Sequence, residues 1–237
     1  MTTTVRALLI ANANDADAGF VGERFRSHGY AFDECQREHP GEWSSLDDRD
    51  LVLLLGSDWS VYWPNVAANV AAEVAVIREA ARLGVPVFGI CFGTQVLAHA
   101  LGGSVSKAST AEIGWMQIVS DLPHVIADGP WMQWHYDVVT VPPGATELAC
   151  SAAGTQAWQM GRVFSTQFHP EATETMLRRW CSGDGADELI RVGLSIEELL
   201  AVSRSNVDLS RANSDRIVDW FLESVVPSEF HGVLDKP

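Results

Sequence analysis

The chain has 237 residues, of which 47% are hydrophobic and 20% are charged, a composition typical of a folded globular protein rather than a disordered one. Its 16 Lys and Arg against 31 Asp and Glu give a formal net charge of −15. Because such a field repels phosphates and anionic lipids, we expect neither nucleic acid nor a membrane as a partner. No apolar run approaches the roughly 20 residues that span a bilayer, and the N-terminus lacks signal-peptide features, so we expect a cytoplasmic protein.

The first half of the chain predicts alternating strands and helices. Short continuous apolar runs at 6–13, 51–56 and 85–90 are typical of strands that are covered on both faces. Between the last two, apolar residues recur at helical spacing over 63–84 and the helix is closed by Gly84. A strand, helix, strand succession implies parallel pairing.

The second half predicts shorter pieces and a sheet that continues with antiparallel or mixed edges. They are strands around 112–120 and 137–142, a hairpin over 157–171 that turns at Met160-Gly161, and helices at roughly 172–182 and 209–226 with a partly helical stretch between them. No repeat, low-complexity tract or long linker interrupts the chain, so we expect a single domain.

The segment GICFGTQ, residues 89–95, places Cys91 between a predicted strand and a predicted helix over 94–103. A cysteine at such a sharp turn is a candidate nucleophile, because the N–H groups at the helix start favour a thiolate and can receive an oxyanion. Phe92 would supply one of these N–H groups. On position alone, a cysteine that merely packs at the turn is an equally good interpretation.

The base that a nucleophilic cysteine needs is predicted in QFHPE, residues 167–171. Pro170 marks the end of a strand there, and residues two apart share one face, so His169 and Glu171 can touch. A carboxylate beside an imidazole orients it, as in a catalytic triad, although a surface histidine at a strand end is the alternative. His99 lies about 12 Å along the predicted helix from Cys91 and is set aside.

The other cysteines, Cys35, Cys150 and Cys181, are scattered without metal-binding spacing. We therefore expect no zinc site and no disulfide framework, and we interpret these residues as small hydrophobic side chains. The sequence also contains no P-loop, and we expect neither a metal nor a cofactor.

Together, GICFGTQ and QFHPE resemble the nucleophile and His-Glu motifs of the class I glutamine amidotransferases. The segments LLLGSDWSVY (53–62), AEIGW (111–115) and WHYDVVTVPPGATELACS (134–151) are also similar to segments of that family. The resemblance is to free-standing relatives of the amidotransferase domain of GMP synthetase. It implies one flavodoxin-like α/β domain over 1–237 with a nucleophile elbow, a largely parallel central sheet, a catalytic core at about 50–175 and C-terminal helices at about 172–226.

By this resemblance, Cys91 would attack the side-chain amide of glutamine and form a γ-glutamyl thioester, while His169 would protonate the leaving ammonia and then activate water. Glu171 would orient His169. Gln95 would hold the substrate from the same helix face as Cys91. The backbone N–H groups of Ser57 and Phe92 would form the oxyanion hole.

Other substrate contacts are implied at Gly56 and in the loop that holds Trp134, Tyr136 and Asp137. Two departures from the family pattern stand out. Ser57 replaces a glycine and would be strained if its φ were positive, in which case the oxyanion hole would form only after a backbone rearrangement or would be imperfect. Tyr136 replaces a frequent glycine beside Trp134, so these aromatic side chains either narrow the glutamine pocket or belong to the core; His135 between them is interpreted as structural.

Three functions remain open at this point. The first is a glutaminase that hands ammonia to a synthetase partner, because no acceptor site is recognised in the chain. The second is a γ-glutamyl hydrolase or peptidase with the same thioester chemistry, which Ser57, Trp134 and Tyr136 keep open. The third is a degenerate member of the family that has lost turnover.

Overall fold

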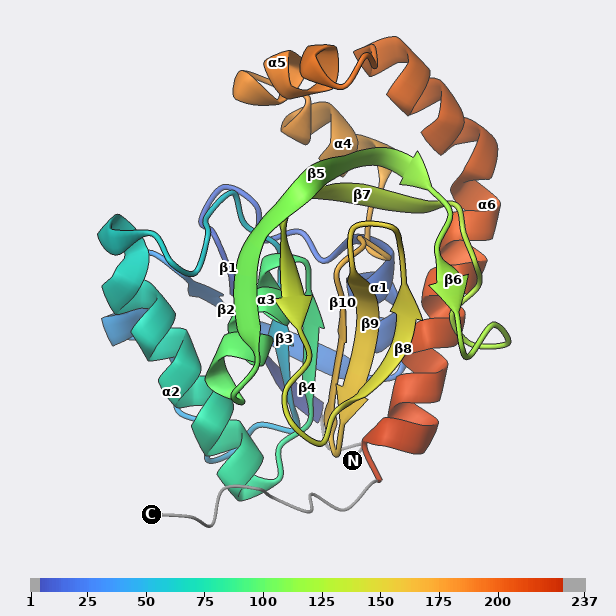
Figure 1. Ribbon diagram of the computed structural model, residues 1–237. Coiled ribbons are helices and arrows are strands. Elements are labelled where there is room, and N and C mark those ends of the chain that lie inside the picture. The colour runs from blue at the N-terminus through green and yellow to red at the C-terminus, as the bar shows by residue number, and fades with distance from the viewer. Residues whose placement is uncertain (1–4, 228–237) are drawn as a thin grey trace.

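The fold is built around one mixed β-sheet. In a computed structural model, which describes residues 5–227, eight strands form a sheet in the order β2-β1-β3-β4-β10-β9-β8-β6 (Figure 1). The strands from β2 to β10 pair in parallel, and β9, β8 and β6 continue the sheet antiparallel. The strands are β1 Val5–Ala11, β2 Tyr30–Gln36, β3 Leu51–Leu54, β4 Val87–Ile90, β6 Val119–Ser120, β8 Thr146–Cys150, β9 Thr155–Met160 and β10 Val163–Thr166. The predicted α/β architecture is confirmed.

The apolar strands explain how both faces of the sheet are covered. Leu9 and Leu53 belong to one core cluster, and Leu8 and Leu54, their chain neighbours, belong to a second. The alternation places each cluster on its own face of the sheet. The first cluster contains residues of α1 and α6, and the second contains residues of α2 and α3, so helices cover both faces.

The helices and short turns follow the strands in chain order. They are α1 Gly19–Ser27, the 3-10 turns Pro40–Glu42 and Pro64–Val66, α2 Ala67–Leu83, α3 Phe92–Ala100, α4 Glu174–Trp180, α5 Asp184–Arg191, α6 Ile196–Trp220 and a π-helical turn Phe221–Val225. The helix predicted over 63–84 is confirmed in its main part, and it ends at Gly84 in a left-handed conformation with φ +70°. Glycine adopts this conformation without steric cost.

A second, two-stranded sheet and three helices form an arm above the carboxyl ends of the parallel strands (Figure 1). The sheet pairs β5 Ser104–Met116 with β7 Trp131–Thr140. A third core cluster joins it to α4, α5 and the first turns of α6, through residues such as Met132, Leu189 and Leu199. The arm is therefore a packed part of the fold.

Two of the predicted strands were wrong in extent. The strand expected at 112–120 is in fact two strands in different sheets, because β5 pairs with β7 whereas β6 pairs with β8. The strand expected at 137–142 begins much earlier, at Trp131, and ends at Thr140 before Pro142, which cannot donate to a ladder. The hairpin predicted to turn at Met160-Gly161 is confirmed by the pairing of Met160 with Val163.

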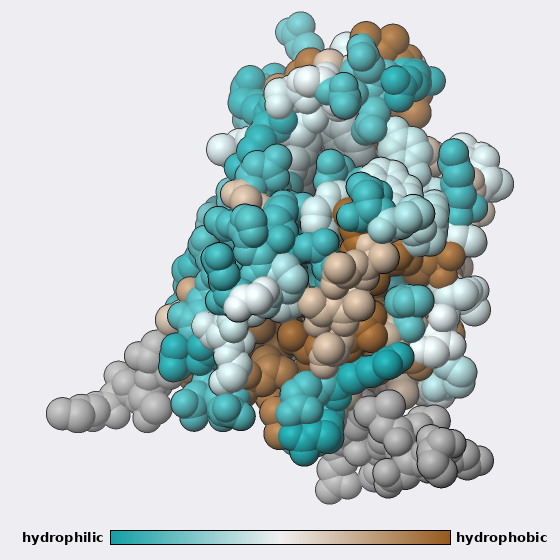
Figure 2. Space-filling view, turned by 90° about the vertical axis from the view of Figure 1, so that its left-hand side faces the viewer, coloured by the Kyte–Doolittle hydropathy of each residue, from teal (hydrophilic) through white to brown (hydrophobic). Residues whose placement is uncertain are grey.

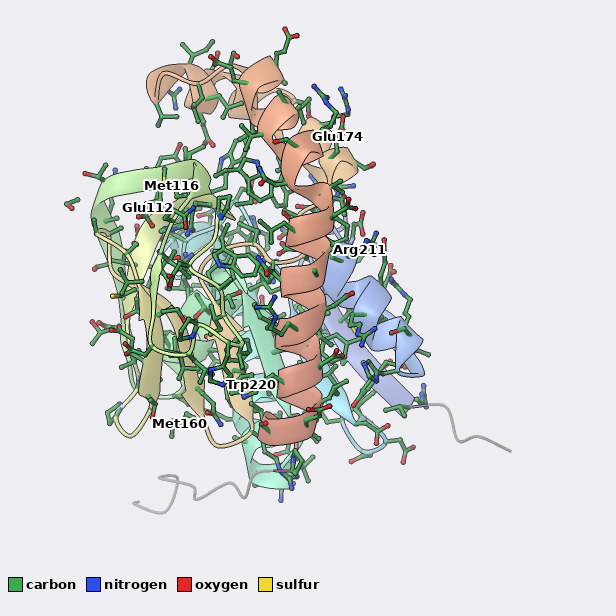
Figure 3. All side chains as sticks on the ribbon, turned by 90° about the vertical axis from the view of Figure 1, so that its right-hand side faces the viewer. Glu112, Met116, Met160, Glu174, Arg211 and Trp220 are labelled. Carbon is green, nitrogen blue, oxygen red and sulfur yellow. The ribbon has the colours of Figure 1, made fainter. Side chains whose placement is uncertain are left out.

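The last helix was also predicted wrongly, since α6 begins at Ile196 instead of 209. Ser195 and Glu198 form a capping box that starts the helix. From there α6 runs down one side of the molecule, where Arg204 contacts Glu174 of α4 and Arg211 contacts Glu23 of α1 (Figure 3). The long helix thus connects the arm to the main sheet.

The outer face of the first half of α2 is apolar. Ala67, Ala68, Ala71 and Ala75 are exposed on it, and Figure 2 shows an apolar patch on this side of the molecule, bordered by hydrophilic surface. Within residues 5–227, no helix is both long and apolar enough to cross a membrane.

Candidate active site

Cys91 occupies a strained turn between β4 and α3. Its φ is +52° and its ψ is −105°, and no other non-glycine residue in 5–227 has a positive φ. Its backbone N–H donates to the carbonyl oxygen of Thr166 in β10 at 2.8 Å. Backbone strain of this kind persists only where the surrounding structure enforces it, and it gathers at functional sites. The turn at Cys91 therefore has the backbone geometry of the predicted nucleophile elbow.

The two glycines of the elbow are required by close packing. A Cβ on Gly89 would lie 2.5 Å from Leu97 Cδ1 and 2.9 Å from the backbone of Gly93, and a Cβ on Gly93 would lie 2.4 Å from the carbonyl oxygen of Leu54. Contacts this short are not tolerated. The glycines let α3 begin directly against β3 and β4, which brings the start of the helix to Cys91.

His169 and Glu171 meet as the sequence predicted. His169 Nδ1 lies 2.7 Å from Glu171 Oε1, and the two residues are 6% and 2% exposed. The backbone N–H of His169 also donates to the carbonyl oxygen of Met132 in β7 at 2.8 Å, which fixes the end of the strand. With Nδ1 on the carboxylate, Nε2 is the ring nitrogen left for chemistry, as in a triad.

Gly56 lies where the thiol and the imidazole approach each other. A Cβ built on Gly56 would be 3.2 Å from His169 Cε1 and 3.6 Å from Cys91 Cβ.

Burial disfavours the charged imidazole, but the negative charges of Glu171 and Cys91 outweigh burial and hold the pKa of His169 well above its ordinary value. The raised pKa means that the imidazole of His169 is suited to hold a proton beside Cys91.

Two more groups touch the Cys91 sulfur. The carbonyl oxygen of Trp134 lies 3.8 Å from Sγ, and the Gln167 side-chain Nε2 lies 3.6 Å from it. Gln167 was missed by the sequence analysis. It lies two residues before His169, so the same rule that placed His169 and Glu171 on one face would have found it.

Buried polar atoms without a hydrogen-bond partner gather at this site. Among the described residues they include Oε1 of Gln95, Oε1 of Gln167, Nε2 of His169 and Oε2 of Glu171. Such groups are rare in folded proteins, and at a functional site they are free for a ligand.

A cleft of about 710 Å³ opens over these groups. The cleft is lined by nearly all the candidate site residues that the sequence analysis named, namely Gly56, Ser57, Cys91, Gln95, Trp134, Tyr136, Asp137, His169 and Glu171. Phe92 does not line it, because its ring is fully buried behind the elbow and only its backbone is suited to an oxyanion. The strain expected at Ser57 is absent, since its φ is not positive.

Asp137 is a buried carboxylate, 3% exposed, whose two oxygens accept hydrogen bonds from Ser60 Oγ at 2.6 Å and from Tyr62 OH at 2.7 Å. Both hydroxyls donate, so they hold the Asp137 side chain in place as a hydrogen-bond acceptor at the cleft. His135 beside it lies 3.0 Å from the Asp137 carbonyl oxygen through Nδ1 and 3.1 Å from Glu112 through Nε2. Both ring nitrogens are occupied, in keeping with the structural role predicted for His135.

Trp134 lines the cleft and also packs against the third core cluster, whereas Tyr136 lies exposed at the rim. The Trp134 indole donates to Glu188 of α5 at 2.6 Å and packs edge-on against Trp180 of α4. Tyr136 is 38% exposed, and partial burial and the charge of Glu188 raise the pKa of its hydroxyl. Trp180 also lies over His169, with 4.7 Å between ring centroids. The arm thus forms one wall of the cleft.

The sequence analysis missed these arm residues. Asp15, Arg179, Trp180, Asp184 and Glu188 line the cleft. They come from a loop after β1 and from two helices after the HPE motif, and no local pattern in the sequence places them beside Cys91. Residues 5–227 contain no group of three or more His, Cys, Asp or Glu side chains that could hold a metal ion.

Comparison with known proteins supports the resemblance. The family model described as glutamine amidotransferase class-I matches residues 64–179. A crystal structure of a glutamine amidotransferase from Thermotoga maritima is similar with a TM-score of 0.83 and 27% identity, covering 94% of this chain and all of that one. The chain belongs to the class I glutamine amidotransferase family.

Curated members of the family similar to this chain are named GMP synthase [glutamine-hydrolyzing]. The protein from Aeropyrum pernix is 35% identical over 170 residues, which cover 66% of this chain and 32% of that one. The protein from Nitrosomonas eutropha is 36% identical over 190 residues, covering 72% and 34%. This amidotransferase family member therefore spans about a third of the length of these relatives.

Proposed function

We propose that the protein hydrolyses the side-chain amide of glutamine through a thioester on Cys91 and releases ammonia for a synthetase. The observation that carries the proposal is the constellation of Cys91 at a strained elbow and the buried His169–Glu171 pair, 2.7 Å apart. The names of the curated relatives, which include the words glutamine-hydrolyzing, support the choice of substrate. We further propose that residues 1–237 form one amidotransferase domain.

Formation of the thioester begins with attack of the Cys91 thiolate on the amide carbon of the substrate. The tetrahedral oxyanion would be received by the N–H groups of Ser57 and Phe92. As the carbon–nitrogen bond breaks, the proton held on His169 Nε2 passes to the nitrogen, and ammonia leaves. The raised pKa of His169 supports this step, because the imidazole holds its proton before the attack.

Hydrolysis of the thioester reverses the roles. His169, now neutral, takes a proton from water, and the hydroxyl oxygen attacks the thioester carbon. The carbon–sulfur bond breaks, glutamate leaves and the thiolate is restored beside the imidazolium. Glu171 holds the ring in the same orientation throughout, because it keeps Nδ1 protonated.

The amino-acid end of glutamine would lie against Gln95 and Asp137. Gln95 is 4% exposed and its Oε1 has no partner, so it can accept from an ammonium group. Asp137 supplies a negative charge for the same group, held in place by Ser60 and Tyr62.

A partner synthetase is proposed because the similar GMP synthases contain much more chain than this one, which matches about a third of their length. The exposed aromatic side chains Tyr62 and Trp63, 49% and 40% exposed at the cleft, offer a contact for such a partner. If the isolated protein turned over glutamine at full rate and co-purified with no synthetase, this part of the proposal would be wrong.

A γ-glutamyl hydrolase is the second candidate, and the size of the cleft favours it. A cleft of about 710 Å³ leaves space beyond the amide of glutamine for a larger leaving amine. The arm residues Trp134, Tyr136 and Glu188 would contact that amine. The reaction at Cys91 would be the same, with an amine leaving in place of ammonia.

The deciding experiment compares product release from glutamine with release from γ-glutamyl dipeptides and γ-glutamyl amines, each with a Cys91→Ala control. Under our proposal, kcat/KM is highest for glutamine and vanishes in the control. A higher kcat/KM for a γ-glutamyl amine would establish the second candidate. No Cys91-dependent release from any substrate, with or without a synthetase, would indicate a degenerate member.

A further inference from the structure

Arg37, the residue after β2, is buried and uses every donor of its guanidinium. It is 0% exposed, and it forms an ion pair with Glu73 of α2, which is also 0% exposed. Its contacts are Nε to Glu73 Oε1 at 2.6 Å, Nη1 to Asn12 Oδ1 at 2.6 Å and to the Gly56 carbonyl at 2.9 Å, and Nη2 to the carbonyls of Leu55 at 3.0 Å and Ile10 at 3.5 Å.

A gain in folding stability does not by itself explain the buried ion pair and hydrogen bonds of Arg37. A buried ion pair is often no more stabilising than apolar side chains of the same volume, because both charges must be stripped of water. What an apolar pair could not do is hold the backbone carbonyls that Arg37 gathers. Two of them, those of Leu55 and Gly56, lie directly after β3, where the chain enters the cleft.

The contact with the Gly56 carbonyl determines where the next N–H points. In a trans peptide the C=O and the following N–H point in opposite directions. The carbonyl of Gly56 turns back to the buried Arg37, so the N–H of Ser57 turns away from it. Gly56 itself faces Cys91 and His169, and within residues 5–227 the Ser57 N–H makes no hydrogen bond.

Arg37 also touches the other side of the elbow. Its guanidinium carbon lies 4.8 Å from the centre of the Phe92 ring, a cation–π contact from behind the first residue of α3. Phe92 carries the second N–H assigned to the oxyanion hole. A single side chain is therefore in contact with Phe92 and with the carbonyl of the peptide group whose N–H belongs to Ser57.

We propose that Arg37 is a positioning residue that holds the Ser57 and Phe92 N–H groups in register with the oxyanion of the acylation step. The proposal rests on the proposed function, because it concerns the same oxyanion hole. Lysine could not replace Arg37, since an ammonium has three donors and no planar fork to reach acceptors on both sides.

The test compares two reactions of Cys91 that differ in their need for an oxyanion hole. With p-nitrophenyl acetate, the thiolate adds to the carbonyl carbon, an oxyanion forms, the carbon–oxygen bond breaks and p-nitrophenolate leaves. With iodoacetamide, the sulfur–carbon bond forms as iodide leaves, and no oxyanion arises. The ratio of the two rates, each corrected with Cys91→Ala, reports on the oxyanion hole and not on glutamine recognition.

The variants are Arg37→Lys and the double variant Arg37→Met/Glu73→Leu, which removes both buried charges so that neither is left unpaired. We expect the ratio of the acylation rate to the alkylation rate to fall at least about tenfold in both variants. Removal of an oxyanion donor lowers kcat about 100- to 1,000-fold, and this sets the upper end of the expected decrease. Arg24→Met is the matched control. It breaks the ion pair with Asp219, far from the elbow, and should leave the ratio unchanged.

The proposal is overturned if the ratio stays within about threefold of wild type, or if both rates fall together, because either result would give Arg37 a purely structural role. It is also overturned if wild-type Cys91 shows no acylation above the Cys91→Ala background. Hydrolysis of glutamine is measured separately on the wild type. Its absence would refute the proposed function while the ratio still tests Arg37.

Discussion

Replacing Glu171 with glutamine should shift the reactivity of Cys91 to higher pH. The variant keeps the shape of the side chain but removes the negative charge 2.7 Å from His169 Nδ1. A buried hydrogen bond to a charged group contributes about 1.5–3 kcal/mol. The carboxylate accepts from Nδ1 whether His169 is charged or neutral, but its negative charge stabilises only the imidazolium. Without that charge, the thiolate–imidazolium form should weaken by about this amount.

The magnitude follows from one tenfold change for each 1.36 kcal/mol. We expect the rate of Cys91 alkylation by iodoacetamide at neutral pH to fall about 10- to 150-fold in Glu171→Gln. The rate should recover at high pH, where the thiol ionises without the help of His169.

The assay is the alkylation rate between pH 5 and pH 10, followed by mass spectrometry of the Cys91 peptide. Glu174→Gln is the matched control, because Glu174 is a nearby carboxylate that pairs with Arg178 and Arg204 at the surface. Its profile should coincide with that of wild type. If Glu171→Gln gave the same profile as well, the carboxylate would not stabilise the imidazolium and our account of the site would be refuted.

Three further predictions concern packing, binding and pH. Gly89→Ala should lower the free energy of unfolding in urea by about 1–3 kcal/mol through overpacking, whereas Gly41→Ala, with open space around it, should change it by less than about 0.5 kcal/mol. Asp137→Asn should raise KM for glutamine about tenfold or more with little change in kcat, as initial rates would show. The pKa of His169 is raised on folding, so the stability that Glu171 provides should be complete below about pH 6.5. That stability should be lost as the pH rises through the raised pKa. Urea titrations of wild type and Glu171→Gln at several pH values would measure the difference.

Each of these has a result that would count against it. Equal stability losses for Gly89→Ala and Gly41→Ala would mean that the elbow can relax around a methyl group. A fall in kcat at constant KM for Asp137→Asn would place the carboxylate in the chemical step. A stability difference for Glu171→Gln that grew with pH would reverse the assigned sign of the His169 shift.

The parts of the site that could be predicted from sequence are those carried by local patterns. Cys91 lies at the end of an apolar strand, and His169 and Glu171 lie two apart at a strand end, so the alternation of side chains was enough to bring them together. The central sheet was predictable for a similar reason, since short apolar runs separated by helical spacing imply parallel pairing.

What could not be predicted depends on contacts between distant segments. Glu188 reaches Trp134 only because α5 folds back over β7, and Arg37 meets Gly56 only because β2 and β3 both flank β1. The start of α6 is different, because Ser195 and Glu198 form a capping box that is readable from sequence and was overlooked. The apparent conflict at Ser57 disappeared because the backbone there does not adopt a positive φ.

The most direct test of the account is to label the protein with an electrophilic glutamine analogue, with and without excess glutamine, and to map the adduct by mass spectrometry beside Cys91→Ala. We predict a single adduct on Cys91 that glutamine prevents from forming. Labelling of Cys91 no faster than that of the buried Cys35 and Cys181, or labelling that glutamine does not slow, would contradict a glutamine site built on this triad.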